Sequence, residues 1–324
     1  MKRPRVSLLL SASKLSASAL LVMALACGEA SDTGLPGGAQ AISLRGDTLF
    51  APEAEEAVQT QRRLELEEAL ADLEAEPESA EALIWAGRRY AYLGEYRQAI
   101  ELFTEGAERF PSDARFLRHR GHRFITVREL DHAIGDFSRA AELTRGQPDE
   151  IEPDGQPNAR GIPTSTLQFN IWYHYGLAHY LKGEFEEALE KYRECMAVSK
   201  NQDSRVATAH WLYMTLRRLG REDEALEVVE SIDFGEEVIE SGSYLDLLRL
   251  YAGGLDPRES TPGLENASLE GATVGYGVGN WYFYNGDSEA AERTFRQVLE
   301  ARDQWASFGY IAAEAEVARM EGGA

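Results

Sequence analysis

A pattern of small and large apolar residues recurs along this chain at a constant distance, and this period constrains the fold more than any other feature. Gly87 and Gly121 lie 34 residues apart, and so do Ala99 and Ala133. A fixed period of this length is typical of proteins in which each unit buries its apolar face only by stacking on its neighbours. The period therefore predicts an array of stacked helical units.

Further copies of the pattern follow at longer intervals. A third copy is centred on Gly176, 55 residues after Gly121, which is one period plus an insertion of 21 residues. The fourth and last clear copies contain Gly220 and Gly286, which are 66 residues apart. Because two periods of 33 fit this interval, we expect one degenerate repeat between them, with its first helix at "SYLDLLRLY" and its second eroded by "GGLDPRESTPG".

The pattern resembles that of the tetratricopeptide repeat. In the first copy it consists of Leu83, Gly87, Tyr90, Gly94, Ala99, Phe103, Ala107 and Pro111. The resemblance covers roughly residues 55–320 and implies an all-α fold, a right-handed α-solenoid of about five to six helix pairs, one of them degenerate. Small residues let two helices cross closely while aromatic side chains fill the space beside them. The resemblance says little about function, because such solenoids serve many tasks.

These features divide the chain into segments. We expect a signal peptide at 1–26, a tether and linker at 27–52, an N-terminal helix at 53–77, repeats 1 and 2 at 78–143, an acidic, proline-rich loop at 144–165, repeats 3 and 4 at 166–239, a degenerate repeat at 240–271, a last repeat at 272–303 and a C-terminal capping helix at 304–324. The loop has four prolines, three glycines and four carboxylates. A loop of this length in a folded domain is either functional or disordered.

The first 26 residues have the features of an export signal. Four basic residues and no acidic ones occupy positions 1–14, and the apolar run "LSASALLVMALA" follows. Twelve residues are too few to span a bilayer of about 30 Å as a helix, which favours a cleaved segment. "ALAC" resembles the lipobox of bacterial lipoproteins and implies a lipidated Cys27 at the start of the mature chain. Ala24 and Leu25 depart from that pattern, so ordinary secretion remains an alternative.

These expectations place the protein outside the cytoplasm. With a lipid on Cys27 it would be a membrane-anchored lipoprotein that faces the periplasm or the cell surface, and Gly28 favours the outer over the inner membrane. A soluble periplasmic or secreted protein is the alternative. The formal net charge of −22 argues against a nucleic-acid partner, because phosphate binding depends on Lys and Arg.

Cationic residues nevertheless gather in one place. The stretch "RFLRHRGHRF" (115–124) contains four arginines and two histidines. The resemblance implies that the first helix of each repeat lines a concave surface, and on a helical period Arg115, Arg118, His119 and His122 share the face that points there. Arg120 lies on the packing face instead, where we expect a carboxylate partner.

Other repeats carry further cationic and aromatic residues on the equivalent face. The candidate binding residues are Arg88, Tyr92, Arg115, Arg118, His119, His122, Tyr173, His174, Tyr180, His210, Trp211 and Arg217. Arginine, tyrosine and tryptophan are enriched at binding hot spots. We therefore expect a non-enzymatic adaptor of the cell envelope that binds an acidic or carboxylate-bearing peptide or protein segment. The arginines would hold the anion, the rings would add apolar contact, and protonated histidines would strengthen binding below roughly pH 6.5.

Three alternatives remain. The arginines can pair with carboxylates of the next repeat and have only a structural role. The aromatic rings can stack on sugars, which would make the protein a glycan or cell-wall-fragment binder. The acidic loop at 144–165 can occupy the Arg/His face as an internal plug.

Enzymatic motifs are missing from the sequence. HExxH, GxSxG and CxxC do not occur, and "GYGVGN" has Asn280 where a dinucleotide-binding turn needs glycine. His174 and His179 are five residues apart, a poor spacing for one metal on one helix face. We therefore expect no catalytic residues, no metal and no cofactor.

Overall fold

The computed structural model describes residues 34–255, 257 and 268–322. The predicted signal peptide and Cys27 lie outside these residues. The described residues form thirteen α-helices and one two-stranded sheet, which confirms the predicted all-α solenoid. None of the described helices is long and apolar enough to cross a membrane. Leu35–Ala324 is one compact unit of the chain.

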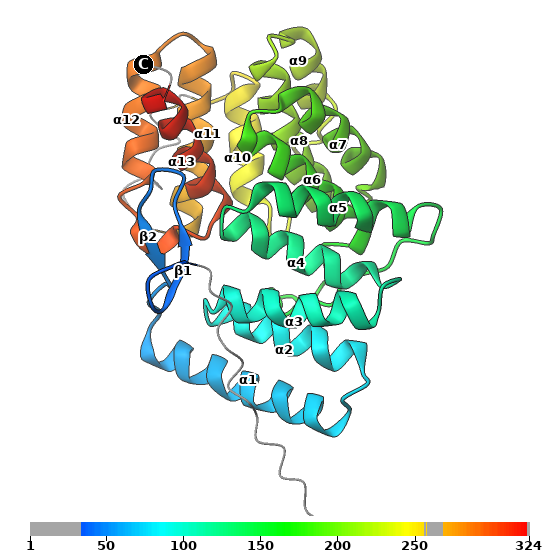
Figure 1. Cartoon of the computed structure of the whole chain (residues 1–324). Coiled ribbons are helices and arrows are strands. Elements are labelled where there is room, and N and C mark those ends of the chain that lie inside the picture. Colours follow the sequence, from blue (N-terminus) through cyan, green and yellow to red (C-terminus); the bar gives the residue numbers. More distant parts are fainter. Residues whose placement is uncertain (1–33, 256, 258–267, 323–324) are drawn as a thin grey trace, which may run out of the picture. The chain divides into compact units, whose positions relative to one another are not determined.

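The first nine helices follow the predicted order. They are α1 (Glu56–Ala75), α2 (Ala80–Tyr92), α3 (Tyr96–Arg109), α4 (Ala114–Thr126), α5 (Leu130–Thr144), α6 (Leu167–Lys182), α7 (Phe185–Val198), α8 (Gln202–Arg218) and α9 (Glu222–Glu230). Helices α2 to α9 form the four predicted pairs, and each pair packs against the next (Figure 1).

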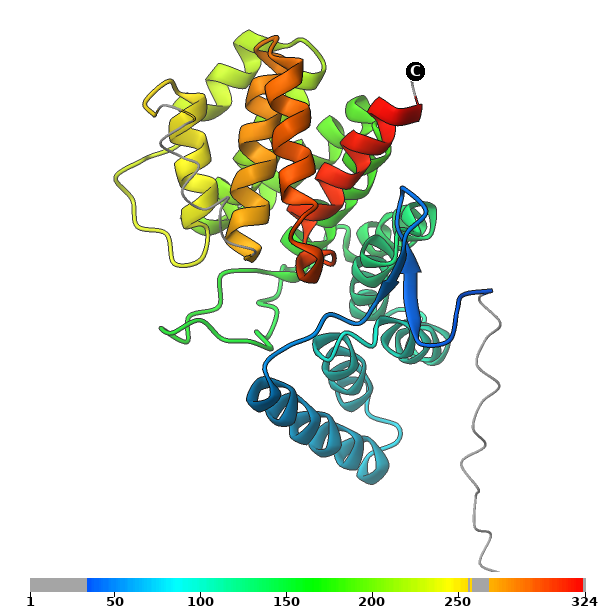
Figure 2. The same ribbon diagram turned by 90° about the vertical axis from the view of Figure 1, so that its left-hand side faces the viewer.

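The last part of the unit departs from simple repetition. Helix α10 (Gly242–Tyr251) is the expected first helix of the degenerate repeat, and the expected second helix falls largely outside the described residues. The last pair is α11 (Leu269–Tyr284) with α12 (Ser288–Val298), so it begins three residues before the predicted 272. After a short 3-10 helix, η2 (Arg302–Gln304), helix α13 (Phe308–Gly322) packs on α11 and α12 and also touches α6 (Figure 2). The predicted cap thus reaches back to the third repeat.

Small residues have the role that the repeat pattern predicts. A Cβ atom added to Gly87 in α2 would lie 2.5 Å from Cε1 of Phe103 in α3. The same addition to Gly279 in α11 would lie 2.4 Å from Cε1 of Phe295 in α12. Both aromatic rings are buried, so each glycine leaves room for the ring of its partner helix.

The predicted linker at 27–52 contains a folded element. Strands β1 (Ala39–Ile42) and β2 (Thr48–Phe50) pair as an antiparallel hairpin. Arg97 Nε of α3 donates to the carbonyl of Gln40 at 2.8 Å, and Trp305 Nε1 donates to the carbonyl of Phe50, also at 2.8 Å. The hairpin is therefore fixed by partners far away in sequence, which local composition did not indicate.

One buried carboxylate joins three distant segments. Arg128 occupies the turn after α4 with φ 68°, where the turns after α2 and α6 have Gly94 and Gly183. Its guanidinium donates to Oε2 of Glu314 in α13 at 2.7 Å, and the side chains are 3% and 2% exposed. The backbone N–H of Leu44, in the hairpin, donates to the same glutamate at 2.5 Å.

Candidate functional site

Five of the predicted binding residues belong to the core. Tyr180, His210 and Trp211 are at most 1% exposed, and Tyr173 and His174 are also buried. Their polar atoms bond within the protein: Trp211 Nε1 donates to the hydroxyl of Tyr173 at 2.7 Å. The prediction that these residues face a ligand is wrong.

The cause of this burial is the later part of the chain. Helices α10 and α11 pack against α8, and α13 against α6, so they cover the face that the repeats alone would leave open. Tyr276 of α11 donates a hydrogen bond to the hydroxyl of Tyr180 at 2.9 Å. Phe308 at the start of α13 lies with its ring centroid 5.3 Å from that of His174. The repeat pattern did not specify where these elements would dock.

Two predicted arginines have local carboxylate partners. Arg115 pairs with Asp113 and Glu81, each at 2.7 Å. Arg217 pairs with Glu222 at 3.2 Å and lies over the ring of Tyr284. Both arginines therefore agree with the alternative that they pair with carboxylates and have only a structural role.

The expectation for Arg120 is confirmed. Its Nε and Nη2 atoms donate to the two carboxylate oxygens of Asp136 at 2.8 and 2.7 Å.

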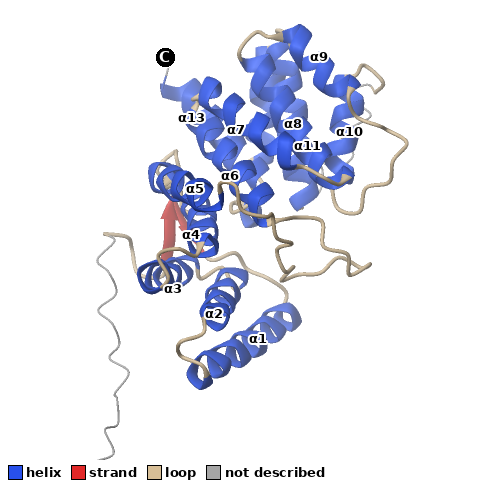
Figure 3. Cartoon of the chain, turned by 90° about the vertical axis from the view of Figure 1, so that its right-hand side faces the viewer, coloured by secondary structure: helices blue, strands red, loops and turns tan. Residues whose placement is uncertain are grey.

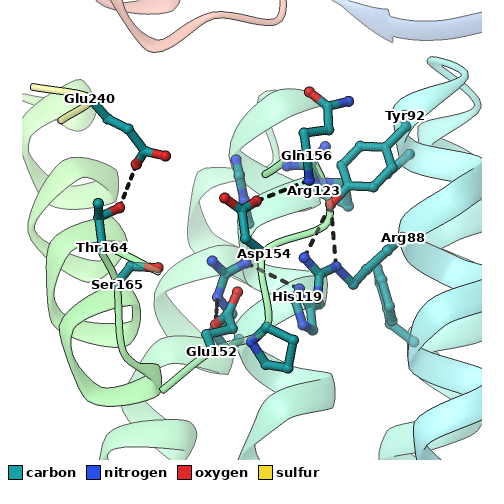
Figure 4. A pocket seen from close by; sticks show the side chains of 15 residues that line it. Arg88, Tyr92, His119, Arg123, Glu152, Asp154, Gln156, Thr164, Ser165 and Glu240 are labelled. Carbon is teal, nitrogen blue, oxygen red and sulfur yellow. Dashed lines mark hydrogen bonds and ion pairs between the residues drawn. The ribbon is translucent and has the colours of Figure 1, made fainter. Parts of the chain in front are cut away.

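The remaining predicted residues surround one cavity of about 250 Å³ (Figure 4). Helix α2 contributes Arg88 and Tyr92, helix α4 contributes Arg118, His119, His122 and Arg123, and the 144–165 loop contributes Glu152 and Asp154. We call Arg88, Arg118 and Arg123 the arginine wall. Neither α2 nor α4 places a carboxylate in the lining, so the negative groups come from the loop and from Glu240.

The centre of the arginine wall holds a carboxylate of the chain itself. Arg118 Nε lies 2.8 Å from Glu152 Oε2, and the two side chains are only 9% and 11% exposed. Nη1 of Arg118 donates to Nδ1 of His119 at 3.1 Å, which makes that nitrogen an acceptor and the ring neutral.

The other two arginines of the wall have no carboxylate partner among the described residues. Arg88 is buried, donates to the hydroxyl of Tyr92 at 3.1 Å and lies over the ring of Trp85. Arg123 is partly buried, with its guanidinium carbon 5.5 Å from the ring centre of Tyr96. Burial lowers the pKa of Arg123 to about 10, which indicates a cation that the surroundings do not fully compensate. The site thus retains positive charge beside an occupied centre.

Arg123 was absent from the predicted site. It lies four residues after His119 in the quoted basic stretch, so helical spacing alone would have placed it on the same face.

The histidines do not behave as predicted. Burial lowers the pKa of His119 and of His122 well below 6.5, and neighbouring arginines lower both further. Burial also lowers the pKa of His174 well below 6.5, and that of His210 to about 3. These rings remain neutral at mildly acidic pH, so the expected strengthening of binding below roughly pH 6.5 is wrong.

The 144–165 loop is held on the site by contacts at both ends and in its middle. Leu167 N–H donates to the carbonyl of Glu150 at 2.9 Å, and Asn158 Nδ2 donates to Glu240 at 2.9 Å. Between these points the loop runs against α2 (Figure 3): a Cβ atom on Gly155 would lie 2.0 Å from the hydroxyl of Tyr92 and 2.8 Å from Nη2 of Arg88. Glycine therefore lets the loop backbone lie close to the Tyr92 hydroxyl and the Arg88 guanidinium.

The described residues contain neither a candidate metal site nor a reactive thiol. Among the described residues, no group of three or more His, Cys, Asp or Glu side chains could hold a metal ion. Cys195 is buried and contacts the hydroxyl of Thr208 at 3.2 Å, and burial raises its pKa to about 12, opposite to a reactive thiolate.

Comparisons with known proteins identify the repeats. Residues 86–148 and 169–202 match models of the tetratricopeptide repeat. No curated protein matches the sequence. Among solved structures the chain is similar to YrrB, described as a TPR protein with an unusual peptide-binding site, with 16% identity over 73% of this chain and 93% of that one and a TM-score of 0.41. It is also similar to MamA, with 18% identity over 54% of this chain and 85% of that one and a TM-score of 0.40. The chain is therefore an α-solenoid that contains tetratricopeptide repeats.

Proposed function

We propose that this chain is a non-enzymatic binding scaffold whose arginine wall captures an acidic or carboxylate-bearing segment of a peptide or protein. Tetratricopeptide repeats generally bind protein partners, which supports the general role. The observation that carries the specific role is the ion pair between Arg118 and Glu152, because it shows a carboxylate held by the wall. Guanidinium groups suit this task since they bind carboxylates through several N–H donors.

In this proposal the 144–165 loop is an internal occupant of the site. Its Glu152 and Asp154 supply carboxylates at the wall, where we expect an external ligand to place its own. A tethered group competes at an effective concentration in the millimolar range. An external segment of similar chemistry therefore binds the native chain weakly and gains affinity when the loop is displaced.

The cell-envelope role is the second part of the proposal. It is supported by the export signal and by Cys27 in the sequence, which would anchor the scaffold to a membrane. Replacement of Cys27 by Ser should release the protein into the soluble periplasmic or secreted fraction and abolish labelling by a radioactive fatty acid. Unchanged membrane association and no lipid label on the native chain would favour ordinary secretion.

Burial of several aromatic rings weakens the alternative that the protein binds glycans or cell-wall fragments. Of the rings that were expected to stack on sugars, Tyr173, Tyr180 and Trp211 are buried in the core. Tyr92 lines the cavity, but its hydroxyl is engaged by Arg88.

A peptide copy of the loop tests the proposed binding directly. The probe is a fluorescently labelled peptide with the sequence of residues 149–156, "DEIEPDGQ", whose binding is followed by anisotropy. The double variant Arg88→Gln and Arg123→Gln should weaken its affinity at least about tenfold, because two buried cations are lost from the wall.

The matched control for that experiment removes a cation elsewhere. Arg139 in α5 is exposed and pairs with Glu142, so Arg139→Gln should leave the affinity unchanged. Equal affinity of the native chain and the double variant would contradict the proposal. So would binding that does not weaken as salt is raised.

A further inference from the structure

A second cavity, of about 760 Å³, adjoins the first one. The two cavities share His122 and Glu240 in their linings. The second one lies at α10 and α11, and Ala306, Ser307 and Phe308 close its other side. We call it the α10–α11 cavity. A segment that enters the first cavity can therefore continue into the second.

The linings of the two cavities differ in charge, because three arginines and three carboxylates line the first. The α10–α11 cavity is lined by Glu240, Asp246 and Glu270, and no Arg or Lys of the described residues lines it. Asp246 pairs with Arg249 at 2.6 Å, whereas within the described part of the chain Glu270 accepts only a hydrogen bond from Ser243 Oγ at 3.3 Å. Glu240 accepts hydrogen bonds from Asn158 and Thr164 and has no cationic partner in the described ranges. Two carboxylates are thus available to a cation from outside.

Aromatic rings line the α10–α11 cavity beside Glu240, which the two cavities share. The ring centroid of Phe308 lies 5.2 Å from that of His122, which is neutral. Tyr244 stacks on His210 with centroids 4.6 Å apart, and its hydroxyl contacts that of Tyr173 at 3.2 Å. Packing therefore fixes both rings before any ligand arrives. Leu269, 61% exposed, adds an apolar side chain at the rim.

We infer that the two cavities together bind one peptide segment that carries a carboxylate, then a large apolar side chain, then a basic side chain. This inference rests on the proposed function and specifies its ligand. The carboxylate lies at the arginine wall, the apolar side chain lies on Phe308 and Tyr244, and the cation lies at Glu240 and Glu270. A uniformly acidic segment would meet like charge in the α10–α11 cavity, so the charge pattern selects against it.

Synthetic peptides that differ at one position test this specificity. Each peptide has seven residues and contains one Glu, one Leu and one variable residue, which is Lys, Gln or Glu. Every combination is made twice, with these three residues in this order and in the reverse order. In at least one direction the Lys peptide should bind the full chain about fivefold more tightly than the Gln peptide, because its ammonium group forms an ion pair with the exposed carboxylates of Glu240 and Glu270. The Glu peptide should bind more weakly than the Gln peptide.

The variant Glu270→Gln sharpens the test. Glutamine still accepts the hydrogen bond from Ser243, so the variant is expected to fold, and a thermal melt verifies this. The preference for Lys over Gln should fall to about twofold or less, while the affinity of the Gln peptide stays the same. As a control, Glu289→Gln removes an exposed carboxylate of α12 that pairs with Arg293 and should preserve the preference.

Two results would overturn the inference: equal binding of the Lys and Gln peptides, or a Lys preference that persists in Glu270→Gln. Equal binding of the Lys and Gln peptides is also expected if a second copy of this chain, or a part of the chain outside the described residues, fills the α10–α11 cavity. Binding of the "DEIEPDGQ" probe separates the two proposals. If that probe still requires Arg88 and Arg123, only the specificity inference fails; if it does not, the proposed function fails.

Discussion

Buried arginines occur in two regions of this molecule, and they have different partners. Around α13, Arg128 pairs with Glu314 and Arg218 pairs with Glu316, and all four side chains are at most 7% exposed. At the arginine wall, only Arg118 has a carboxylate partner among the described residues, and a loop supplies it. Because a buried charge is costly unless it is paired, the first region is organised for stability and the second retains capacity for a ligand. Arginine thus stabilises the fold in the first region and stays available for a ligand in the second. The difference depends on whether the elements packed around the arginine supply a carboxylate.

The carboxylate of Glu316 is held in its charged state. Burial alone would raise the pKa of Glu316, but the guanidinium groups of Arg218 and Arg319 hold it below its usual value. A carboxylate with a lowered pKa contributes stability above its unfolded pKa of about 4.5, and this contribution is lost as the pH falls toward the folded value.

The largest expected effect comes from breaking a pair in the α13 region. Arg128→Ala should lower the free energy of unfolding by about 3–5 kcal/mol, because it leaves Glu314 buried with only the hydrogen bond from Leu44. Chemical denaturation followed by circular dichroism measures the change. The exposed Arg139→Ala should cost less than about 0.5 kcal/mol. A loss in Arg128→Ala as small as that in Arg139→Ala would contradict the claim that the buried pairs around α13 stabilise the fold.

A smaller effect concerns His210, a buried histidine of α8. The pKa of His210 is lowered to about 3, so below pH 6.5 the unfolded chain binds a proton that the folded chain does not. Stability is therefore lost as the pH falls through 6.5, by about 1.4 kcal/mol between pH 7.5 and 5.5 for this one residue. His210→Gln should remove that part of the pH dependence. An unchanged slope of unfolding free energy against pH would mean that folding does not lower the pKa of His210.

The smallest effect has the opposite sign. Burial lowers the pKa of Arg123 to about 10, so its charge opposes folding at neutral pH. Arg123→Met should raise the free energy of unfolding by about 1 kcal/mol, since it replaces a poorly compensated cation near the Tyr96 ring by an apolar side chain. Thermal denaturation would register the gain. A clear loss of stability would mean that Arg123 is a structural residue like Arg128, and the two regions would no longer differ.

The repeats were predictable from sequence because their packing is local. Gly87 and Phe103 belong to one helix pair, and their spacing carries the information that places them together. The same holds for the face that brings Arg118, His119 and His122 to one cavity, and helical spacing would have added Arg123. Local periodicity therefore specified the helices and the basic end of the site.

Contacts between distant segments were not predictable in this way. Tyr180 and Trp211 lie on the face that was expected to be open, and only the docking of α11 and α13 buries them. Nothing in the sequence near Glu152 indicated that it would pair with Arg118, 34 residues away, although the loop was considered as an internal plug. Such pairings depend on where a whole element docks, and a local pattern does not encode this.

The most direct test of the account is to displace the loop without changing any charge. In Gly155→Val, the new side chain would overlap the Tyr92 hydroxyl and Nη2 of Arg88, and we expect the loop backbone to move away from the arginine wall. Gly135→Ala is the control, since no atom lies within 4 Å of the added Cβ there. The measurement is the affinity of the labelled "DEIEPDGQ" peptide for each variant. The account predicts that it rises at least about tenfold in Gly155→Val and stays at the native value in Gly135→Ala. An affinity that is unchanged or lower in Gly155→Val would contradict the claim that the loop occupies a site for acidic ligands.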